Sequence, residues 1–297
     1  MLQILLTFYL LFGSGFLLKK LNLFKKEDIT VFVNYIIYFA LPVAILGVIH
    51  DFKFSIKDFA VFTTAWISIA FTALVVLKIL KPFVGDEKTL KSLFLSASFG
   101  NTAFVGYPIA YTLFGDKGLA YAILYDVIGN FLTVITVGIF IITGKVEWRL
   151  LYKFPPLGAL LLAFLLKGVP LTLLKTFIGT VKKSIVPSIV FALGLRFEPQ
   201  KAFKNIKWAT FAVIWRQLVI PLAVIPLLLL FKEFLNLPFE ELAVILLQSS
   251  MPPFVMAVIL SERYKLNIDL SLAAANLGLL LLPIFLPLWL KVAKNLF

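Results

Sequence analysis

The chain has 297 residues, no cysteine and one histidine; 61% of its residues are hydrophobic and 14% are charged. This composition excludes a disordered protein, a disulfide-stabilised secreted domain and any cysteine-ligated metal site. The mean hydropathy is +1.02, and soluble domains are only about 45–50% apolar. The chain is therefore predicted to be an all-α polytopic membrane protein.

The formal charge of +13 arises from 28 Lys and Arg against 15 Asp and Glu. The basic residues lie in short gaps between apolar runs, without a basic helix face or a patch interleaved with aromatic residues. Loop lysines of this kind follow from the positive-inside rule for bilayer proteins. The lipid bilayer is thus an expected partner, and nucleic acid is not.

Ten apolar runs are long enough to cross ~30 Å of hydrocarbon, which takes about 20 helical residues. Their approximate limits are 1–18, 29–49, 59–80, 90–114, 118–142, 155–169, 172–197, 206–231, 238–261 and 269–292. The first run lacks a basic n-region and a small-residue cleavage site, so it is interpreted as a retained span and not as a signal peptide. The sixth and seventh runs are the least sharply bounded, because four lysines interrupt them.

The basic residues favour alternate gaps between these spans. One set of gaps contains Lys19, Lys20, Lys25, Lys26, Lys81, Lys88, Lys91, Lys145, Arg149, Lys153, Arg196, Lys201, Lys204, Lys207, Arg263 and Lys265. The other set contains only Lys53, Lys57, Lys117, Lys167, Lys232, Lys291 and Lys294. The richer gaps are expected in the cytoplasm. With an even number of spans, both termini then lie on the outer side of the cytoplasmic (inner) membrane.

The sequence also predicts two halves, 1–143 and 155–297, joined by a short cytoplasmic linker at 144–154. An offset of 145 residues aligns Pro42 with Pro187 and Pro108 with Pro253. Because each half has an odd number of spans, the second half would be inverted in the membrane. Two inverted five-helix repeats are an architecture of secondary transporters.

The fourth and ninth spans are interrupted near their middles, where the sequence reads FGNTAFVGYP at 99–108 and QSSMPP at 248–253. Proline removes a backbone donor and glycine tolerates unwound backbone, so both helices are predicted to be broken. Such breaks are harmless kinks in many membrane helices. Here their matched positions, with Asn101 and Gln248 beside them, favour an anion site between opposed half-helices.

These residues resemble the auxin efflux carrier family, which contains the plant PIN-type carriers and bacterial permeases for malate, malonate and similar acids. The first crossover of that family is matched by Gly100-Asn101-Thr102, Gly106-Tyr107-Pro108-Ile109, Phe114-Gly115, Gly118-Leu119 and Tyr125-Asp126. The second is matched by Met251-Pro252, Ser261-Glu262-Arg263-Tyr264 and Asp269. Pro155-Pro156, Ile185-Val186-Pro187, Leu193-Gly194, Arg216 and Pro221 also fit the family pattern.

The resemblance implies ten spans that cross at the fourth and ninth, an architecture shared with NhaA and the bile-acid symporters. It implies elevator-type alternating access, with a scaffold of spans 1, 2, 6 and 7 that meets a second copy in a homodimer. It gives Asn101 contact with the substrate carboxylate, and it sets 252–253 opposite 100–101, an offset of 152 and not 145. Gly100 stands where the plant carriers have proline, and their large central hydrophilic loop is absent.

The candidate site residues fall into three groups. Substrate binding is expected at Gly100, Asn101, Thr102, Gln248, Pro252 and Pro253; coupling or organisation at Asp126, Arg216, Asn130 and Asn276; and an outer vestibule at Lys182 and Lys183. A charge at mid-bilayer costs at least about 2.5–3.5 kcal/mol, so Asp126 and Arg216 either pair with each other or serve transport. The two asparagines either bond between helices or contact substrate. The two lysines either snorkel to the headgroups or attract an anion.

The predicted function is secondary transport of a small organic carboxylate, with proton coupling or uniport favoured. A sodium-coupled organic-anion symporter of the bile-acid type is the alternative, since Gln248, Ser249 and Ser250 offer oxygen ligands without an acidic neighbour. A channel is a further alternative. An enzyme is not expected, because the single histidine, His50, lies at a span end and no phosphate-binding loop is present. No metal or cofactor is implied.

Overall fold

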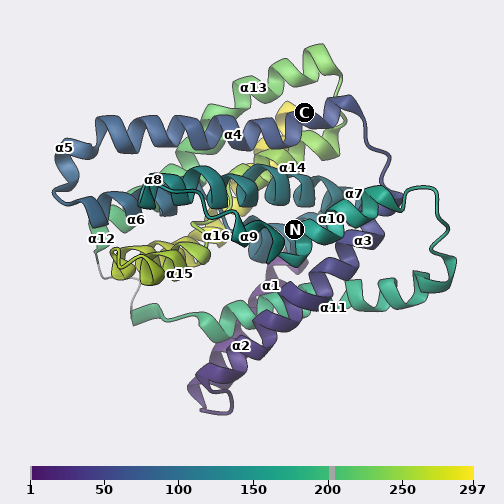
Figure 1. The fold of residues 1–297 in the computed structure, drawn as a ribbon, viewed down its shortest axis with the longest axis horizontal. Coiled ribbons are helices and arrows are strands. Elements are labelled where there is room, and N and C mark those ends of the chain that lie inside the picture. The colour runs from purple at the N-terminus through teal and green to yellow at the C-terminus, as the bar shows by residue number, and fades with distance from the viewer. Residues whose placement is uncertain (1, 201–204) are drawn as a thin grey trace. The chain divides into compact units, whose positions relative to one another are not determined.

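The structure is a computed structural model that describes residues 2–200 and 205–297 (Figure 1). Met1 and residues 201–204, which include Lys201 and Lys204 of the charge pattern, lie outside this range. Within it, every regular element is a helix. The longer α-helices are α1 Leu2–Lys20, α2 Lys26–Tyr35, α3 Leu41–Asp51, α4 Phe59–Leu74, α6 Glu87–Ser98, α7 Tyr107–Ile123, α10 Pro155–Leu165, α11 Lys175–Arg196, α12 Ile206–Ile214, α13 Ile220–Leu235, α14 Phe239–Ser249, α15 Met256–Arg263 and α16 Ile268–Leu296.

Short helices and π-helical turns connect these elements. The short α-helices are α5 Lys81–Val84, α8 Ile139–Thr143 and α9 Arg149–Tyr152, and the 3-10 turns are η2 Ile56–Asp58 and η7 Thr172–Leu174. The π-helical segments are η1 Ile36–Ala40, η3 Val75–Ile79, η4 Thr102–Gly106, η5 Leu124–Phe131, η6 Val134–Gly138 and η9 Trp215–Val219. π-Turns inside α-helices are often found at functional sites.

Among the residues that the structure describes, six helical segments are long and apolar enough to cross a membrane, which confirms the all-helical, multi-pass class. They are Asp28–Asp51, Ile56–Ile79, Thr102–Thr143, Thr172–Arg196, Ile206–Leu235 and Ile268–Leu296. The third has 42 residues, more than one crossing needs. Gly115, with φ 62° and ψ −148°, interrupts it at the boundary predicted between the fourth and fifth spans. The full count of ten spans stays a prediction.

The chain divides into two compact units. Unit 1 is Met1–Phe54, Ala103–Ile123 and Trp148–Phe197; unit 2 is Ser55–Thr102, Leu124–Glu147 and Glu198–Phe297. Unit 1 thus contains the predicted spans 1, 2, 6 and 7, which the family resemblance assigns to a scaffold, together with residues 103–123. The remaining predicted spans belong wholly or partly to unit 2.

In unit 1, α1 and α11 pack closely because each has a glycine at the contact (Figure 1). A Cβ on Gly194 would lie 1.9 Å from the carbonyl oxygen of Phe12, and a Cβ on Gly15 would lie 2.3 Å from that of Phe191. Small residues let membrane helices approach in this way. At the end of α11, Phe197 packs edge-to-face on Phe12, with ring centroids 5.1 Å apart.

Hydrogen bonds in unit 1 join loops that the charge pattern places on the same membrane side. Lys19 donates to the carbonyl of Phe197 over 3.3 Å, which joins two of the Lys-rich gaps. Lys167 donates to the carbonyl of Phe52 over 2.7 Å, which joins two of the Lys-poor gaps. These pairings are the ones that alternating crossings require.

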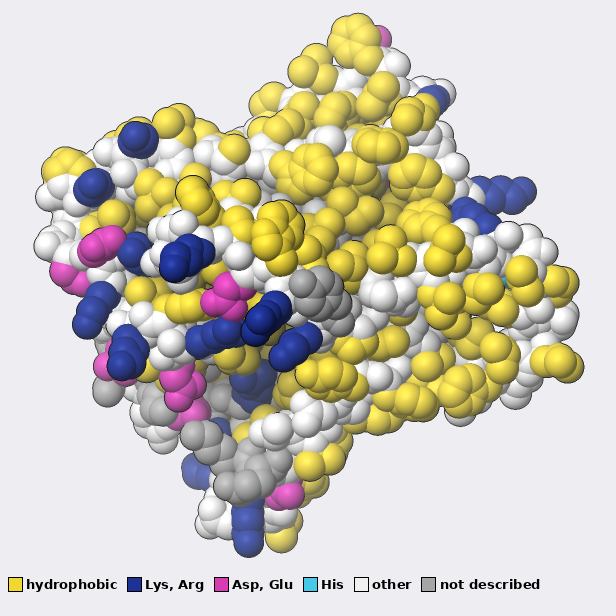
Figure 2. All heavy atoms as spheres, viewed as in Figure 1, with side chains coloured by type: hydrophobic (Ala, Val, Ile, Leu, Met, Phe, Trp, Pro, Cys, Tyr) yellow, Lys and Arg dark blue, Asp and Glu magenta, His cyan; other side chains and the backbone are white. Residues whose placement is uncertain are grey.

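In unit 2, the Lys-rich gaps also meet at one end. Asn267 donates to the Thr89 hydroxyl over 2.9 Å, and Arg263 donates to the Glu147 carboxylate over 2.6 Å. Burial and a hydrogen bond to Glu147 raise the pKa of Tyr264 to about 12. Figure 2 shows Lys and Arg side chains gathered around α5, α6 and α15 on a face that is otherwise largely apolar.

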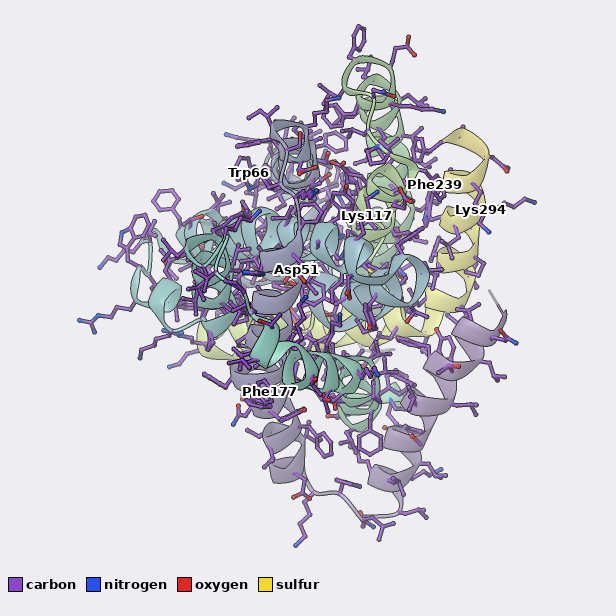
Figure 3. The ribbon with its side chains drawn as sticks, turned by 90° about the vertical axis from the view of Figure 1, so that its right-hand side faces the viewer. Asp51, Trp66, Lys117, Phe177, Phe239 and Lys294 are labelled. Atoms are coloured by element: carbon purple, nitrogen blue, oxygen red, sulfur yellow. The ribbon has the colours of Figure 1, made fainter. Side chains whose placement is uncertain are left out.

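Polar contacts inside unit 2 fix its helices to one another. The Ser261 hydroxyl bridges α15 to α6 and α16, since it lies 3.2 Å from that of Ser92 and 2.8 Å from that of Ser271. Trp66 of α4, labelled in Figure 3, donates to the carbonyl of Ile128 in the π-helical η5 over 3.3 Å. Interhelical hydrogen bonds of this kind are common in membrane proteins.

The close packing of α1 on α11 gives a test of the fold. Gly194→Ala is expected to lower the free energy of unfolding by about 1–3 kcal/mol, because the new methyl group overlaps backbone atoms that cannot move away. Gly179→Ala on the same helix is the control, since a Cβ there meets no atom within 4 Å. Thermal unfolding of both purified variants in detergent measures the difference. Equal melting temperatures would contradict the packing described.

Candidate functional site at the crossing of two broken helices

The fourth and ninth predicted spans break where the sequence predicts. Helix α6 ends at Ser98 and η4 begins at Thr102, and α14 ends at Ser249 before α15 begins at Met256. The corresponding ends, 98 and 249, are 151 residues apart, which agrees with the offset of 152 given by the family resemblance.

The offset of 145 residues is therefore wrong as an alignment of the two breaks. It paired Pro108 with Pro253, but Pro108 lies in the first turn of α7, past the first break, whereas Pro253 lies within the second. Proline is tolerated both in the first turn of a helix and in unwound backbone, so the matching residue type does not imply structural equivalence.

The two breaks are joined to each other by their backbones. Gly100 and Pro253 form an isolated antiparallel bridge. The amide of Asn101 donates to the carbonyl of Pro252 over 2.7 Å, and the amide of Phe254 donates to the carbonyl of Phe99 over 3.1 Å. Prolines 252 and 253 have no N–H to satisfy. Each unwound segment thus supplies hydrogen-bond partners that the other has lost from its helix.

Next to the first break, a series of hydrogen bonds leads from Asn130 through Thr102 to the buried carboxylate of Asp126. The Thr102 hydroxyl donates to Asp126 Oδ1. The Asn130 amide donates to Thr102 Oγ1 over 2.7 Å and approaches the carbonyl of Gly100 at 3.4 Å. The direction of these hydrogen bonds makes Asp126 the final acceptor, and only 8% of its surface is exposed.

Next to the second break, the guanidinium of Arg216 is buried against Gly100. Arg216 is 1% exposed and donates from Nη2 to the carbonyl of Gln248 over 3.1 Å. The Gln248 amide in turn lies 3.4 Å from the carbonyl of Thr102. A Cβ on Gly100 would lie 2.5 Å from Arg216 Nη2, so any other residue, proline included, would displace the guanidinium.

Several buried polar atoms around the crossing have no hydrogen-bond partner among the described residues. They are Asn101 Nδ2, Gln248 Oε1, Arg216 Nε, the Tyr125 hydroxyl and both polar atoms of the Gln217 side chain. Ser98 Oγ, at the end of α6, and Asn276 Nδ2, in α16, also lack a partner there. An unpaired buried group costs about 1–3 kcal/mol, and native proteins keep few of them. Their concentration at the crossing marks a place where a polar ligand can bind.

The structure brings most of the predicted site residues together. Gly100, Asn101, Thr102, Asp126, Asn130, Arg216, Gln248, Pro252 and Pro253 all belong to the crossing in unit 2. Asn276 was placed at a position related to Asn130, but its environment differs. Its Oδ1 accepts from the backbone amide of Glu198 at 3.3 Å and not from a residue of the first break.

The two vestibule lysines lie in unit 1. Lys182 forms an ion pair with Asp116 at 2.6 Å and lies 5.7 Å above the Tyr111 ring. Lys183 is exposed and lines a shallow hollow with Tyr111, Thr112, Gly115, Asp116 and Val186. Lys182 is therefore already neutralised by a carboxylate, and Lys183 is the one that presents its charge to the surface.

Sequence reasoning missed Gln217 and Tyr125 as candidate site residues. Gln217 directly follows Arg216, and a carboxamide inside an apolar run was a signal that could have been used. Both side chains are buried, Gln217 in the π-helical turn η9 and Tyr125 in the π-helical segment η5. Tyr125 lies beside the Arg216 guanidinium.

Replacement of the buried arginine tests this arrangement. Arg216→Ala is expected to lower the free energy of unfolding by about 1.5–3 kcal/mol through loss of a charge-assisted hydrogen bond. Removal of the charge relieves its desolvation, but alanine leaves most of the side-chain volume empty against Gly100. Arg263→Ala is the matched control in the same unit, because its ion pair with Glu147 is part-exposed and is worth less than about 1 kcal/mol. Chemical unfolding in detergent compares the two; an equal effect would contradict the role given to Arg216.

Comparisons with known proteins agree with these features. The model of the membrane transport protein family matches residues 1–147 and 139–290. An uncharacterized transporter of Methanocaldococcus jannaschii is 32% identical over 287 residues, which cover 91% of each chain. An uncharacterized transporter of Methanothermobacter thermautotrophicus is 31% identical over 213 residues, 69% of this chain and 68% of the relative. The resemblance carried by the first crossover is thereby confirmed, and the chain belongs to the membrane transport protein family, the family of the auxin-efflux (PIN-like) carriers.

Proposed function

We propose that the protein is a secondary transporter of small organic carboxylates that binds its substrate at the crossing of the fourth and ninth spans. The observation that carries this proposal is the set of unpartnered donors at the crossing, Asn101 Nδ2 and Arg216 Nε, beside a fully buried positive charge. A carboxylate accepts several charge-assisted hydrogen bonds and neutralises such a charge. Membership of a transporter family supports transport as the use of this site.

The proposed mechanism is elevator-type alternating access in which unit 2 carries the site and unit 1 serves as the scaffold. All nine crossing residues named above belong to unit 2, so they can move together without loss of the bridge between the breaks. The proposal includes ten spans in two inverted repeats, both termini on the outer side, and a homodimer formed through the scaffold. Lys183, exposed on unit 1, would attract the anion from the outer side.

Proton coupling is proposed to act through Asp126. As a carboxylate, Asp126 accepts from Thr102, whose backbone is part of the first break. Protonation would weaken that acceptance and free the hydroxyl to turn toward the carbonyl of Gly100, which lies 3.4 Å away. One proton is thereby linked to the geometry of the substrate site. Sodium coupling is less well supported, because the hydroxyls of Ser249 and Ser250 are bonded within their own helix at 2.7 Å.

Asn101→Ala is expected to abolish transport and to leave the protein folded. The bridge to Pro252 uses the backbone amide of Asn101, which the substitution retains, whereas the unpartnered Nδ2 is lost. Counterflow of labelled malate, malonate and indole-acetate into proteoliposomes measures transport, and the melting temperature measures folding. Asn101→Asp is expected to fail as well, because a carboxylate repels the substrate. Ser261→Ala, which removes a hydroxyl between helices, serves as the control. Unchanged uptake by the Asn101 variants would remove the crossing as the substrate site.

Asp126→Asn is expected to separate exchange from proton-driven accumulation. The asparagine oxygen can still accept from Thr102, so the first break keeps its structure, but no proton can bind. Counterflow should then persist, while accumulation driven by a pH gradient should fall to the level without a gradient. Parallel assays with and without sodium test the alternative coupling. Gradient-driven accumulation by the variant at the wild-type rate would exclude Asp126 as the coupling residue.

A further inference from the structure

The contacts of the Gln217 side chain do not explain why a carboxamide is buried at this position. It is completely buried, and neither Oε1 nor Nε2 has a hydrogen-bond partner in the part of the chain that the structure describes. Its backbone is nevertheless held firmly, since its carbonyl accepts from Trp289 Nε1 at 2.7 Å. A buried carboxamide without any hydrogen bond is among the more costly arrangements in a protein interior. This carboxamide is therefore available to a polar ligand.

The contacts of α16 place Gln217 next to the crossing. Gly278 of α16 packs against the second break, since a Cβ there would lie 2.8 Å from Pro252 Cβ and 2.7 Å from Pro253 Cδ. The same Cβ would lie 3.4 Å from Gln217 Oε1. The carboxamide thus lies beside the second break. The neighbouring side chain, Arg216, reaches Gly100 of the first.

The unpartnered atoms at the crossing are of two kinds. Asn101 Nδ2, Arg216 Nε and Gln217 Nε2 are donors, whereas Gln217 Oε1 and Gln248 Oε1 are acceptors. An exchange of the oxygen and nitrogen of Gln217 leaves this balance unchanged, because both of its atoms are unpartnered. A carboxylate has only acceptor atoms. It can satisfy the three donors, but it leaves both amide oxygens without a donor.

Resting on the function proposed above, we propose that the carried acid has a hydrogen-bond donor, a hydroxyl or amino group near its carboxylate, which the oxygens of Gln217 and Gln248 accept. Gln217 is then a specificity-determining residue of the substrate site. Sites built to bond a substrate hydroxyl reject the analogue that lacks it, because their own buried polar groups are left unpaired. An acid without a donor is therefore bound less well than its hydroxy or amino counterpart.

Two matched sets of acids test the proposal in the full-length protein. Lactate, alanine and propionate share a three-carbon skeleton and differ in a hydroxyl, an amino group or neither; malate, aspartate and succinate do the same with four carbons. Each is used as a competitor and as a labelled counterflow substrate in proteoliposomes. The hydroxy or the amino acid of each set is expected to exchange at least about tenfold faster than the unsubstituted acid. Which of the two is preferred identifies the donor.

Gln217→Leu assigns the preference to this residue. The variant removes the acceptor at similar volume and retains the backbone bond to Trp289, so the ratio of hydroxy or amino acid to unsubstituted acid should fall toward 1. The unsubstituted acid should exchange as well as before or better, which a damaged fold would not produce. Ser271→Ala, which removes a paired hydroxyl elsewhere in unit 2, should leave the ratio unchanged.

The outcomes separate the two proposals. A wild-type ratio near 1 with saturable exchange of all acids would overturn the donor requirement and leave carboxylate transport standing. A high ratio that Gln217→Leu does not change would overturn the assignment to Gln217. Absence of exchange of every acid, in protein shown to be folded, would overturn the transport function and the donor requirement with it.

Discussion

Unwound backbone in a membrane helix must find new hydrogen-bond partners, and this requirement shapes unit 2. The two breaks meet it by pairing with each other, through Asn101 to Pro252 and Phe254 to Phe99. The pairing explains why both helices are broken, since one break alone would lack partners. It also explains the two prolines of the second break, which have no N–H that would stay unpaired. Everything else at the site is held relative to this short bridge.

The bridge brings opposite charges close to one piece of backbone. Asp126 is bonded through Thr102 to the segment that follows Gly100, and Arg216 lies against Gly100 itself. A side chain at position 100 would have to displace the guanidinium, which lies in the space of a Cβ. The buried arginine thus reaches the first break because Gly100 has no side chain in its way.

The sequence was sufficient to locate the breaks and the buried charges, because glycine, proline, aspartate and arginine are conspicuous inside apolar runs. It was not sufficient to align the halves. The proline pair 108 and 253 suggested a false offset, and only the helix ends at Ser98 and Ser249 correct it. Gln217 was missed because its burial depends on the π-helical turn η9, which no residue pattern predicted. Asn130 and Asn276 looked equivalent by position, yet one bonds to the first break and the other to the amide of Glu198.

In the proposed mechanism, the unpartnered polar atoms at the crossing favour a bound substrate while unit 2 moves. Without a ligand, Asn101, Gln217 and Gln248 leave buried donors and acceptors unpaired, which raises the free energy of the empty site. A bound acid that satisfies them lowers that free energy in either position of the unit, because every group concerned belongs to unit 2 itself. Binding at such a site is preorganised, since the atoms are fixed before the substrate arrives. Selectivity then follows from which atoms stay unpaired when the wrong acid binds, so a carrier with acceptors as well as donors at its site distinguishes acids by their donors and not by charge alone.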